Sequence, residues 1–296
     1  MLKFTDQVTK VIANQVFIKL EYLNHKYISG NKFRKLKYNF VEAKKQKKDT
    51  IVTFGGAYSN HIAAVAAAGK EFKFKTIGII RGEELTSQTD LNPTLTFARL
   101  QGMKLLFITR EAYKEKSSDH FLQNLKAKYG DFYLIPEGGT NELAVRGCEE
   151  ILTLDDKKYD YICCPVGTGG TISGLINASG DHQTVLGFPA LKGDFLQEDI
   201  SKFVKKDNWH LMTNYHFGGY AKINEELISF INQFKRANTI PLDPIYTGKM
   251  MYGVMDLLKK GFFKKDDRIL AIHTGGLQGI EGMNIKLKHM NLPTII

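Results

Sequence analysis

The chain has 296 residues, a length within the usual range for two packed domains that share a cleft. Hydrophobic residues make up 43% and the 27 glycines are spread without a low-complexity tract, so the composition excludes a disordered protein. The formal charge of +10 comes from scattered lysine pairs such as Lys44/Lys45 and Lys264/Lys265, which argues against a nucleic-acid partner and for attraction of small anionic molecules.

The N-terminal residues and the cysteines indicate where in the cell the protein is expected to be. The N-terminus MLKFTDQVTK has no apolar signal core, and no apolar run approaches the roughly 18 residues that a membrane span needs. Cys163 and Cys164 are adjacent, and the three cysteines have neither a disulfide framework nor the spacing of a zinc site. We therefore expect a cytoplasmic protein without a metal site and without a membrane partner.

Short apolar runs alternate with longer amphipathic stretches, a pattern typical of parallel strands joined by helices. The predicted helices include residues 61–68, 93–100 and 142–152, the second with Asn92 as its cap and Gly102 as its stop signal. The sequence predicts an α/β protein, in which ligands bind beyond the carboxyl ends of parallel strands. The predicted strands cover residues 50–54, 75–80, 104–108, 131–135, 161–164, 184–188 and 268–273.

A lysine-rich segment, GNKFRKLKYNF at residues 30–40, precedes the first of these strands. By charge alone, such a segment is typical of the solvated face of a helix. The charge pattern alone therefore gives no reason to predict a catalytic or binding role for this segment.

The loop FGGAYSNH, residues 54–61, follows a predicted strand and opens an alanine-rich helix. Free backbone N–H groups and the helix dipole suit an anion at this position, and Ser59 and Asn60 add side-chain donors. The plainer interpretation is a turn at Gly55 and Gly56 followed by an ordinary helix cap. Both interpretations stay open.

The loop PVGTGGTISGL, residues 165–175, also links an apolar strand to a predicted helix. The glycines and threonines of residues 167–171 can form a cradle of N–H and hydroxyl donors around a phosphate, with a plain glycine-rich turn as the alternative. The loop matches neither the Walker A motif nor the GxGxxG fingerprint, so a small phosphate monoester is a better candidate than a nucleotide. In the last loop, IHTGGLQG at residues 272–279, Gly275 and Gly276 would let a flat ligand approach the backbone.

The segment GNKFRKL, residues 30–36, resembles the cofactor-lysine motif of the 1-aminocyclopropane-1-carboxylate deaminase and D-cysteine desulfhydrase family. The motifs GGAYSNH, IPEGGTNELAVRG, GTGGTISGL, LDPIYTGKMMYG and HTGG follow in the order and at intervals comparable to those of the family. Six ordered motifs span most of the chain, whereas the stretch 180–214 is hard to match and the chain is shorter than most members.

The resemblance implies the tryptophan synthase β-subunit-like fold, also called fold type II, with open twisted parallel sheets in two domains and pyridoxal 5'-phosphate in the cleft. It implies a large cofactor-binding domain formed by residues 1–35 with 141–296, and a small α/β domain formed by residues 36–140. Homodimers are usual in the family.

The resemblance also implies the lysine chemistry. Lys32 corresponds to the lysine that holds the cofactor as a Schiff base and later shuttles the substrate's α-proton, for which it must lose its own proton. Lys35 matches a residue that reaches the phosphate. Positive charge on Arg34 and Lys35 is expected to lower the pKa of Lys32.

Further positions follow from the same motifs. Asn60 matches the residue that contacts the phenolic oxygen of the cofactor and lies in the substrate-binding loop. Ser59 and His61 match positions that meet the substrate carboxylate, which suits a helix N-terminus. The phosphate loop is implied to consist of Gly167, Thr168, Gly169, Gly170 and Thr171.

Tyr246 and Thr247 carry the most information about the reaction. In the deaminase branch of the family this tyrosine is followed by a glutamate that faces the pyridine nitrogen, and in the desulfhydrase branch by a threonine. A carboxylate would strengthen the electron sink more than a hydroxyl does, and opening a cyclopropane ring demands more of that sink than losing a good leaving group. Tyr220 matches a second active-site tyrosine, with a tyrosine packed beside a glycine turn as its alternative.

The sequence thus predicts an enzyme that acts on a small amino acid, by α,β-elimination of D-cysteine to pyruvate, ammonia and sulfide. His61, which resembles the desulfhydrase motif SNH more than the deaminase motif SNQ, favours the same reaction. Ring-opening deamination of 1-aminocyclopropane-1-carboxylate to 2-oxobutyrate and ammonia is the main alternative, followed by β-replacement or racemisation. The alternative from another class is a phosphate-ligand binding protein without catalysis.

Overall fold

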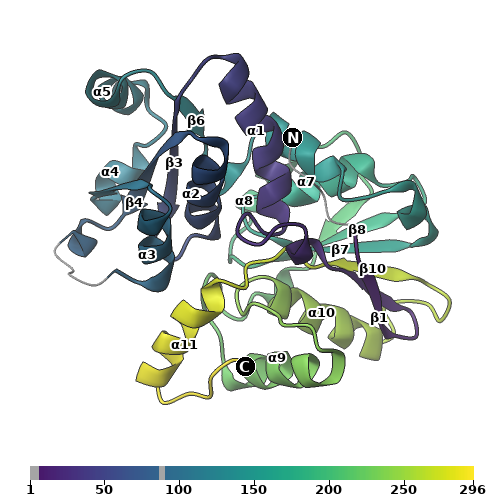
Figure 1. Cartoon of the computed structure of the whole chain (residues 1–296). Helices are drawn as coiled ribbons and strands as arrows, with labels where there is room; N and C mark the ends of the chain where they lie inside the picture. The colour runs from purple at the N-terminus through teal and green to yellow at the C-terminus, as the bar shows by residue number, and fades with distance from the viewer. Residues whose placement is uncertain (1–6, 87–90) are drawn as a thin grey trace.

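A computed structural model describes residues 7–86 and 91–296 (Figure 1). Within these residues the strands form two separate sheets, with the strand orders β1-β2-β10-β7-β8-β9 and β5-β4-β3-β6. All pairings are parallel except the pairing of β1 with β2. The prediction of an α/β fold with parallel sheets is therefore confirmed. The strands of the larger sheet are β1 (Thr9–Ala13), β2 (Val16–Lys19), β7 (Tyr161–Val166), β8 (Thr184–Pro189), β9 (Trp209–Leu211) and β10 (Ile269–Ile272), and those of the smaller sheet are β3 (Thr50–Gly56), β4 (Lys75–Arg81), β5 (Lys104–Ile108) and β6 (Tyr133–Ile135).

Helices cover both sheets and connect their strands (Figure 1). Helix α3 begins with proline after Asn92, whose side chain accepts a hydrogen bond from the Leu95 N–H, as the sequence predicts. The helices are α1 (Asn31–Lys45), α2 (Asn60–Phe72), α3 (Pro93–Leu100), α4 (Arg110–Lys114), α5 (Asp119–Tyr129), α6 (Glu142–Glu149), α7 (Gly170–Ala178), α8 (Phe195–Ser201), α9 (Glu225–Asn238), α10 (Thr247–Lys259) and α11 (Gly279–His289).

The inner strands of both sheets are buried on both faces, which explains why their middle residues are predominantly apolar. In β10, Ile269 and Ala271 belong to one apolar cluster, while Leu270 and Ile272 belong to another on the opposite face. All of the predicted strands are present, with β6 shorter than expected. The strands β1, β2 and β9 were missed.

The helix that carries Lys32 and Lys35 is fixed to its neighbour by a close crossing. A Cβ atom on Gly147 of α6 would lie 2.0 Å from the carbonyl oxygen of Arg34 in α1, so only glycine allows the two backbones to approach this closely. Helix α6 packs in turn against α7. The position of α1 relative to the start of α7 is therefore set by backbone packing.

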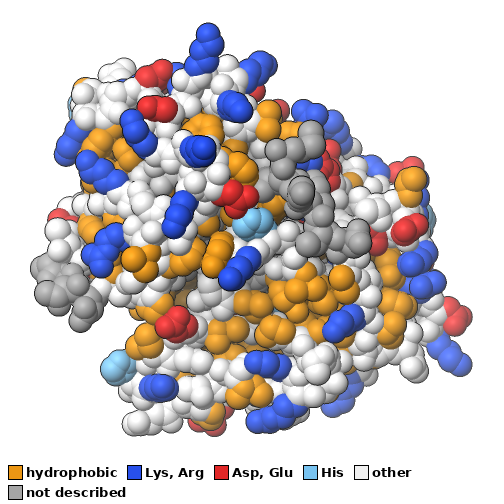
Figure 2. All heavy atoms as spheres, viewed as in Figure 1, with side chains coloured by type: hydrophobic (Ala, Val, Ile, Leu, Met, Phe, Trp, Pro, Cys, Tyr) orange, Lys and Arg blue, Asp and Glu red, His pale blue; other side chains and the backbone are white. Residues whose placement is uncertain are grey.

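The predicted division into domains at residues 35/36 and 140/141 stays a prediction, and its first boundary falls within the continuous helix α1. None of the helices in residues 7–86 and 91–296 is both long and apolar enough to cross a membrane. Figure 2 shows lysine and arginine side chains dispersed over the visible face among apolar and neutral groups.

Candidate active site

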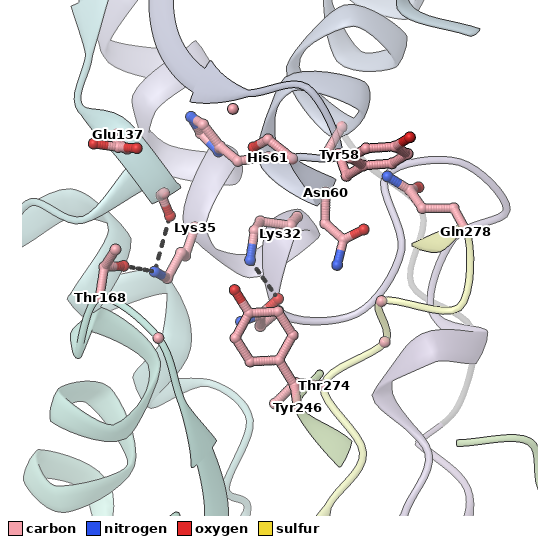
Figure 3. A pocket seen from close by; sticks show the side chains of 18 of the residues that line it. Lys32, Lys35, Tyr58, Asn60, His61, Glu137, Thr168, Tyr246, Thr274 and Gln278 are labelled. Atoms are coloured by element: carbon pink, nitrogen blue, oxygen red, sulfur yellow. Dashed lines mark hydrogen bonds between the residues drawn. The ribbon is translucent and has the colours of Figure 1, made fainter. Parts of the chain in front are cut away.

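A cavity of about 600 Å³ opens between the two sheets, at the ends of the strands where parallel α/β proteins bind ligands. Its walls come from the loop after β3, the loop after β7, the loop after β10 and the first turns of α1 (Figure 3). The predicted site residues Lys32, Lys35, Asn60, Thr168 and Tyr246 all line this cavity. The structure thus brings together motifs from the whole chain.

Lys32 lies in the first turn of α1, with its side chain in the cavity (Figure 3). Its Nζ donates a hydrogen bond to Asn31 Oδ1 at 3.0 Å. Burial, and after it the positive charge of Lys35, lower the pKa of Lys32 from 10.5 to about 7. At neutral pH a substantial fraction of this amine is therefore unprotonated and able to act as a nucleophile or base.

Arg34, the other cation expected to lower this pKa, is paired with two carboxylates, those of Glu21 and Glu150. Arg34 Nε and Nη2 donate to Glu21 Oε2 and Oε1 at 2.8 and 3.0 Å, and both side chains are buried. A guanidinium neutralised by its own carboxylate exerts little net field on a third group. The predicted effect of Lys35 on the pKa of Lys32 is therefore confirmed, and that of Arg34 stays a prediction.

Replacing Lys32 with methionine is expected to stabilise the cofactor-free protein at neutral pH. The folded chain binds the lysine proton less tightly than the unfolded chain. Burial of the charged form therefore lowers the free energy of unfolding at any pH below 10.5. A fall from 10.5 to about 7 corresponds to at most about 5 kcal/mol, at about 1.4 kcal/mol per pKa unit, less a reduction for the partial contact with water. This cost is full below about pH 7 and disappears as the pH rises toward 10.5. Urea unfolding at pH 7 and pH 10 measures the gain, and an equal gain at both pH values would contradict an electrostatic origin.

The predicted phosphate loop lies between the end of β7 and the start of α7. Lys35 Nζ donates to Gly138 O and Thr140 Oγ1 at 3.0 Å, and to Thr168 Oγ1 at 3.4 Å (Figure 3). Asn31 Nδ2 donates to Thr171 Oγ1 at 2.8 Å, which ties the start of α1 to the start of α7. The ammonium, the hydroxyls and the first N–H groups of α7 therefore converge on one place.

This arrangement fits a phosphate group. Among the described residues, no carboxylate lies within ion-pair distance of Lys35, although its side chain is only 2% exposed. Burial lowers the pKa of Lys35, so an anion is needed to stabilise its charge. A Cβ atom on Gly170 would lie 3.2 Å from Lys35 Nζ and 2.8 Å from Thr140 Oγ1, so a side chain there would fill the cradle. The buried Asn60 Oδ1, with no hydrogen-bond partner among the described residues, is a further polar atom that a ligand can satisfy.

The loop after β3 supplies the start of α2. The Ser59 side chain caps this helix by accepting a hydrogen bond from the Ile62 N–H at 3.3 Å. The main-chain N–H groups of Asn60 and His61 belong to the first turn, whose donors have no partner within the helix. They suit a carboxylate, as does the positive end of the helix dipole.

His61 has a defined protonation state. Thr53 donates its only hydroxyl proton to Ile135 O at 2.8 Å, so at 2.8 Å from His61 Nε2 it must accept, and the imidazole carries its proton on Nε2. Burial and the charges of Lys32 and Lys35 lower the pKa of His61 well below its usual value, which keeps the ring neutral. Its only ring N–H is therefore already used, and the group on His61 that can bind a carboxylate is its main-chain N–H.

Tyr246 and Thr247 are held by a buried aspartate that the sequence analysis did not single out. Asp243 accepts hydrogen bonds from the N–H groups of Ile245, Tyr246 and Thr247 at 2.8–2.9 Å, and from Thr247 Oγ1 at 2.7 Å. Tyr246 lines the cavity, whereas Thr247 is fully buried behind it. Because the Thr247 hydroxyl donates to a carboxylate, its remaining lone pair can only accept a hydrogen bond.

Tyr220 lines the same cavity and its ring centroid lies 6.4 Å from that of Tyr246. Burial raises the pKa of Tyr220 and raises that of Tyr246 well above its usual value. Both phenols are therefore protonated at neutral pH and can donate hydrogen bonds. The structure brings the two predicted tyrosines together.

The cavity also involves residues that the sequence analysis missed. Arg81 and Glu137 lie on its rim, and Glu137 pairs with Lys116 at 3.3 Å. Thr140 and Asp243 stand inside two of the quoted motifs, so their place in the motif was the available signal. A buried lysine of lowered pKa, an uncompensated cation at a helix N-terminus and two neutral phenols define an enzyme site for a phosphate-bearing ligand that reacts with an amine.

Comparison with known proteins gives the family. Residues 4–275 match the model of the pyridoxal-phosphate dependent enzyme family. The chain is 28% identical over 297 residues to a putative 1-aminocyclopropane-1-carboxylate deaminase of Pyrococcus horikoshii, covering 94% of this chain and 89% of that protein. It is 32% identical over 295 residues to the mitochondrial bifunctional D-cysteine desulfhydrase/1-aminocyclopropane-1-carboxylate deaminase of Arabidopsis thaliana, covering 90% of this chain and 74% of that protein. The crystal structure of an ACC deaminase homologue superposes with a TM-score of 0.85 at 26% identity, covering 98% of this chain and 95% of that one.

The chain belongs to the family of pyridoxal-phosphate dependent enzymes, and pyridoxal phosphate is its cofactor. The predictions of family, fold and cofactor are confirmed, and small amino acids are the class of substrate. Family membership also removes the alternative of a phosphate-binding protein without catalysis.

Proposed function

We propose that this enzyme eliminates the β-substituent of a small D-amino acid, with D-cysteine converted to pyruvate, ammonia and sulfide. The observation that carries the proposal is the half-buried Lys32, whose pKa is lowered to about 7 beside an anion cradle in one cavity. The choice of elimination is supported by Thr247 and His61, at positions where the resemblance associates these residue types with desulfhydrases.

In this proposal the cofactor is held by residues from three loops. Lys32 would bind it covalently, while Lys35, Thr168 and the first turn of α7 would hold its phosphate. When bound, pyridoxal phosphate supplies an electron sink for the electron pair left at the substrate's α-carbon. Asn60 would contribute its unpartnered Oδ1 or its amide group to the polar edge of the ligand.

The chain's own residues would position the substrate and move its protons. The start of α2 would bind the substrate carboxylate through the main-chain N–H groups of Asn60 and His61. Unprotonated Lys32 would remove the proton at the α-carbon, because its lowered pKa makes it a base near neutral pH. The protonated hydroxyl of Tyr246 or Tyr220 would donate a hydrogen bond to the departing sulfur.

The second candidate is deamination of 1-aminocyclopropane-1-carboxylate to 2-oxobutyrate and ammonia. It is favoured by the names of the relatives from Pyrococcus horikoshii and Arabidopsis thaliana. The carboxylate of Asp243 behind Thr247 also supports it, since this negative charge can strengthen the electron sink indirectly.

A spectrum and a substrate series test both candidates. The purified protein is expected to show the visible band of a lysine-bound cofactor, and then to form keto acid when D-cysteine, L-cysteine, D-serine and 1-aminocyclopropane-1-carboxylate are added in separate reactions. Pyruvate from D-cysteine supports the first candidate, and 2-oxobutyrate without pyruvate supports the second. A protein that stays colourless with added pyridoxal phosphate would overturn both.

We further propose that residues 1–35 with 141–296 and residues 36–140 act as the two domains on either side of the cavity. Homodimer formation and a cytoplasmic location complete the proposal. The reducing compartment is supported by Cys148, Cys163 and Cys164, which are all free thiols. Sedimentation of the purified protein tests the dimer.

A further inference from the structure

Lys249 is a buried cation at a position where an apolar side chain would have a lower desolvation cost on folding. It lies in the first turns of α10, its side chain is 1% exposed, and its neighbours in the sequence belong to the apolar core. Burial lowers the pKa of Lys249 to about 8. Among the described residues no carboxylate is within ion-pair distance of it, so its charge is stabilised by other groups.

Two main-chain carbonyls of one loop bind the ammonium directly, and the negative charge of Asp243 also favours it from a greater distance. Lys249 Nζ donates to His216 O and to Gly219 O, both at 2.8 Å. Hydrogen bonds from a charged donor are about twice as strong as neutral ones. The ammonium therefore draws the two carbonyls of the loop toward the core.

The loop has a backbone conformation that needs such support. Residues 217, 218, 219 and 221 all have positive φ, with values of 52° at Phe217, 89° at Gly218, 115° at Gly219 and 54° at Ala221. Positive φ is unfavourable for Phe217 and Ala221, which carry a Cβ atom. The loop would relax toward other conformations if the ammonium were removed.

Tyr220 stands in this loop, next to the carbonyl that Lys249 binds. Its ring lines the cavity beside Tyr246, with which its hydroxyl shares a hydrogen bond, and 43% of the residue is exposed, so the conformation of the loop decides whether the hydroxyl reaches this partner. We propose that Lys249 is a positioning residue that holds the loop 216–221 and thereby keeps the hydroxyl of Tyr220 over the reacting atoms. This inference rests on the proposed function only in placing the reaction at Tyr220.

Hydrogen–deuterium exchange of the holoenzyme tests the structural half of the proposal. In Lys249→Met, which keeps most of the side-chain volume, the amides of residues 216–221 should exchange at least about tenfold faster than in the wild type, because the loop opens locally. The matched control is Lys259→Met on the same helix, where the lysine is exposed and the loop should exchange as in the wild type. Unchanged exchange in Lys249→Met would overturn the proposal, whatever reaction the enzyme performs.

A double-mutant cycle tests the functional half with whichever substrate the wild type converts. Lys249→Met should lower kcat and retain the visible cofactor band, but it should cause no further loss of kcat in a Tyr220→Phe background. If the fold-losses in kcat of the two single variants multiply in the double variant, Lys249 acts by a route that does not involve Tyr220. Should Lys249→Met fail to fold, Lys249→Gln takes its place in both experiments; its amide can still donate to one of the two carbonyls but carries no charge, so a smaller rise in exchange of about threefold is expected, and unchanged exchange would again overturn the proposal. A wild type that converts no substrate would overturn the proposed function while the exchange result still decides the role of Lys249.

Discussion

Lys32→Ala is expected to lose the visible cofactor band and at least about 10³-fold in kcat, while it remains folded. The loss follows because Lys32 supplies both the covalent attachment and the base, and a positioned base alone contributes about 10²- to 10⁴-fold. The fold should persist, since among the residues that the structure describes the Lys32 side chain has one hydrogen bond, to Asn31, and its removal also relieves the cost of a buried charge. Absorbance, circular dichroism and keto-acid formation measure the three parts of the prediction.

The control for this experiment lies on the same helix. Lys45→Ala removes a lysine whose side chain is 79% exposed and far along α1 from the cavity, so its band and its kcat should match those of the wild type. Full activity in Lys32→Ala would rule out the mechanism. A variant that is inactive because it is unfolded would instead show that Lys32 has a structural role that its contacts do not indicate.

Arg34→Met is expected to lower the free energy of unfolding by about 3–5 kcal/mol, the usual cost of removing one partner of a buried ion pair. Glu21 is 2% exposed, and without Arg34 the donors left to its carboxylate within residues 7–86 and 91–296 are the side-chain amides of Asn24 at 3.3 Å and Gln7 at 3.2 Å. Urea unfolding measures the loss.

Two variants show whether the buried charge is the cause. The double variant Glu21→Leu/Arg34→Met removes both charges and should recover most of the lost stability. Arg110→Met breaks an exposed pair with Glu84 and should change stability by less than about 1 kcal/mol. A double variant as unstable as Arg34→Met would show that packing of the guanidinium, rather than its charge, stabilises the start of α1.

The parts of the fold that the sequence predicted are those with a strong local signal. The runs at β3, β4 and β7 are almost continuously buried and mostly apolar because helices cover both faces of these strands. Strand β1 is largely exposed and pairs only at the edge, and β9 has three residues, so neither gives a recognisable period. Short strands at an edge are specified mainly by their partners.

The candidate site shows the same division between local and tertiary information. Lys32, Lys35 and the phosphate loop stand in contiguous motifs, whereas the direction of Arg34 depends on how α1 packs against η1 (Glu21–Leu23) and α6. The proton position on His61 is set by Thr53, which belongs to a neighbouring strand and is itself fixed by Ile135. Neither the direction of Arg34 nor the proton position on His61 can be predicted from the spacing of residues in the sequence.

Helix α1 couples the reactive amine to the smaller sheet. Phe33, Leu36, Phe40 and Ala43 all pack into the apolar cluster that contains Ile51 of β3, although Lys32 precedes the predicted domain boundary. Tyr246 and Gly275, in contrast, follow elements of the larger sheet. The first turn of α1 is nevertheless tied to the start of α7 by the hydrogen bond from Asn31 to Thr171, so α1, about 22 Å long, bridges the two sheets with Lys32 at the end that is held beside the larger sheet. A substitution at Phe40 is therefore expected to loosen the attachment of the smaller sheet to this bridge while leaving the Lys32 amine in its place.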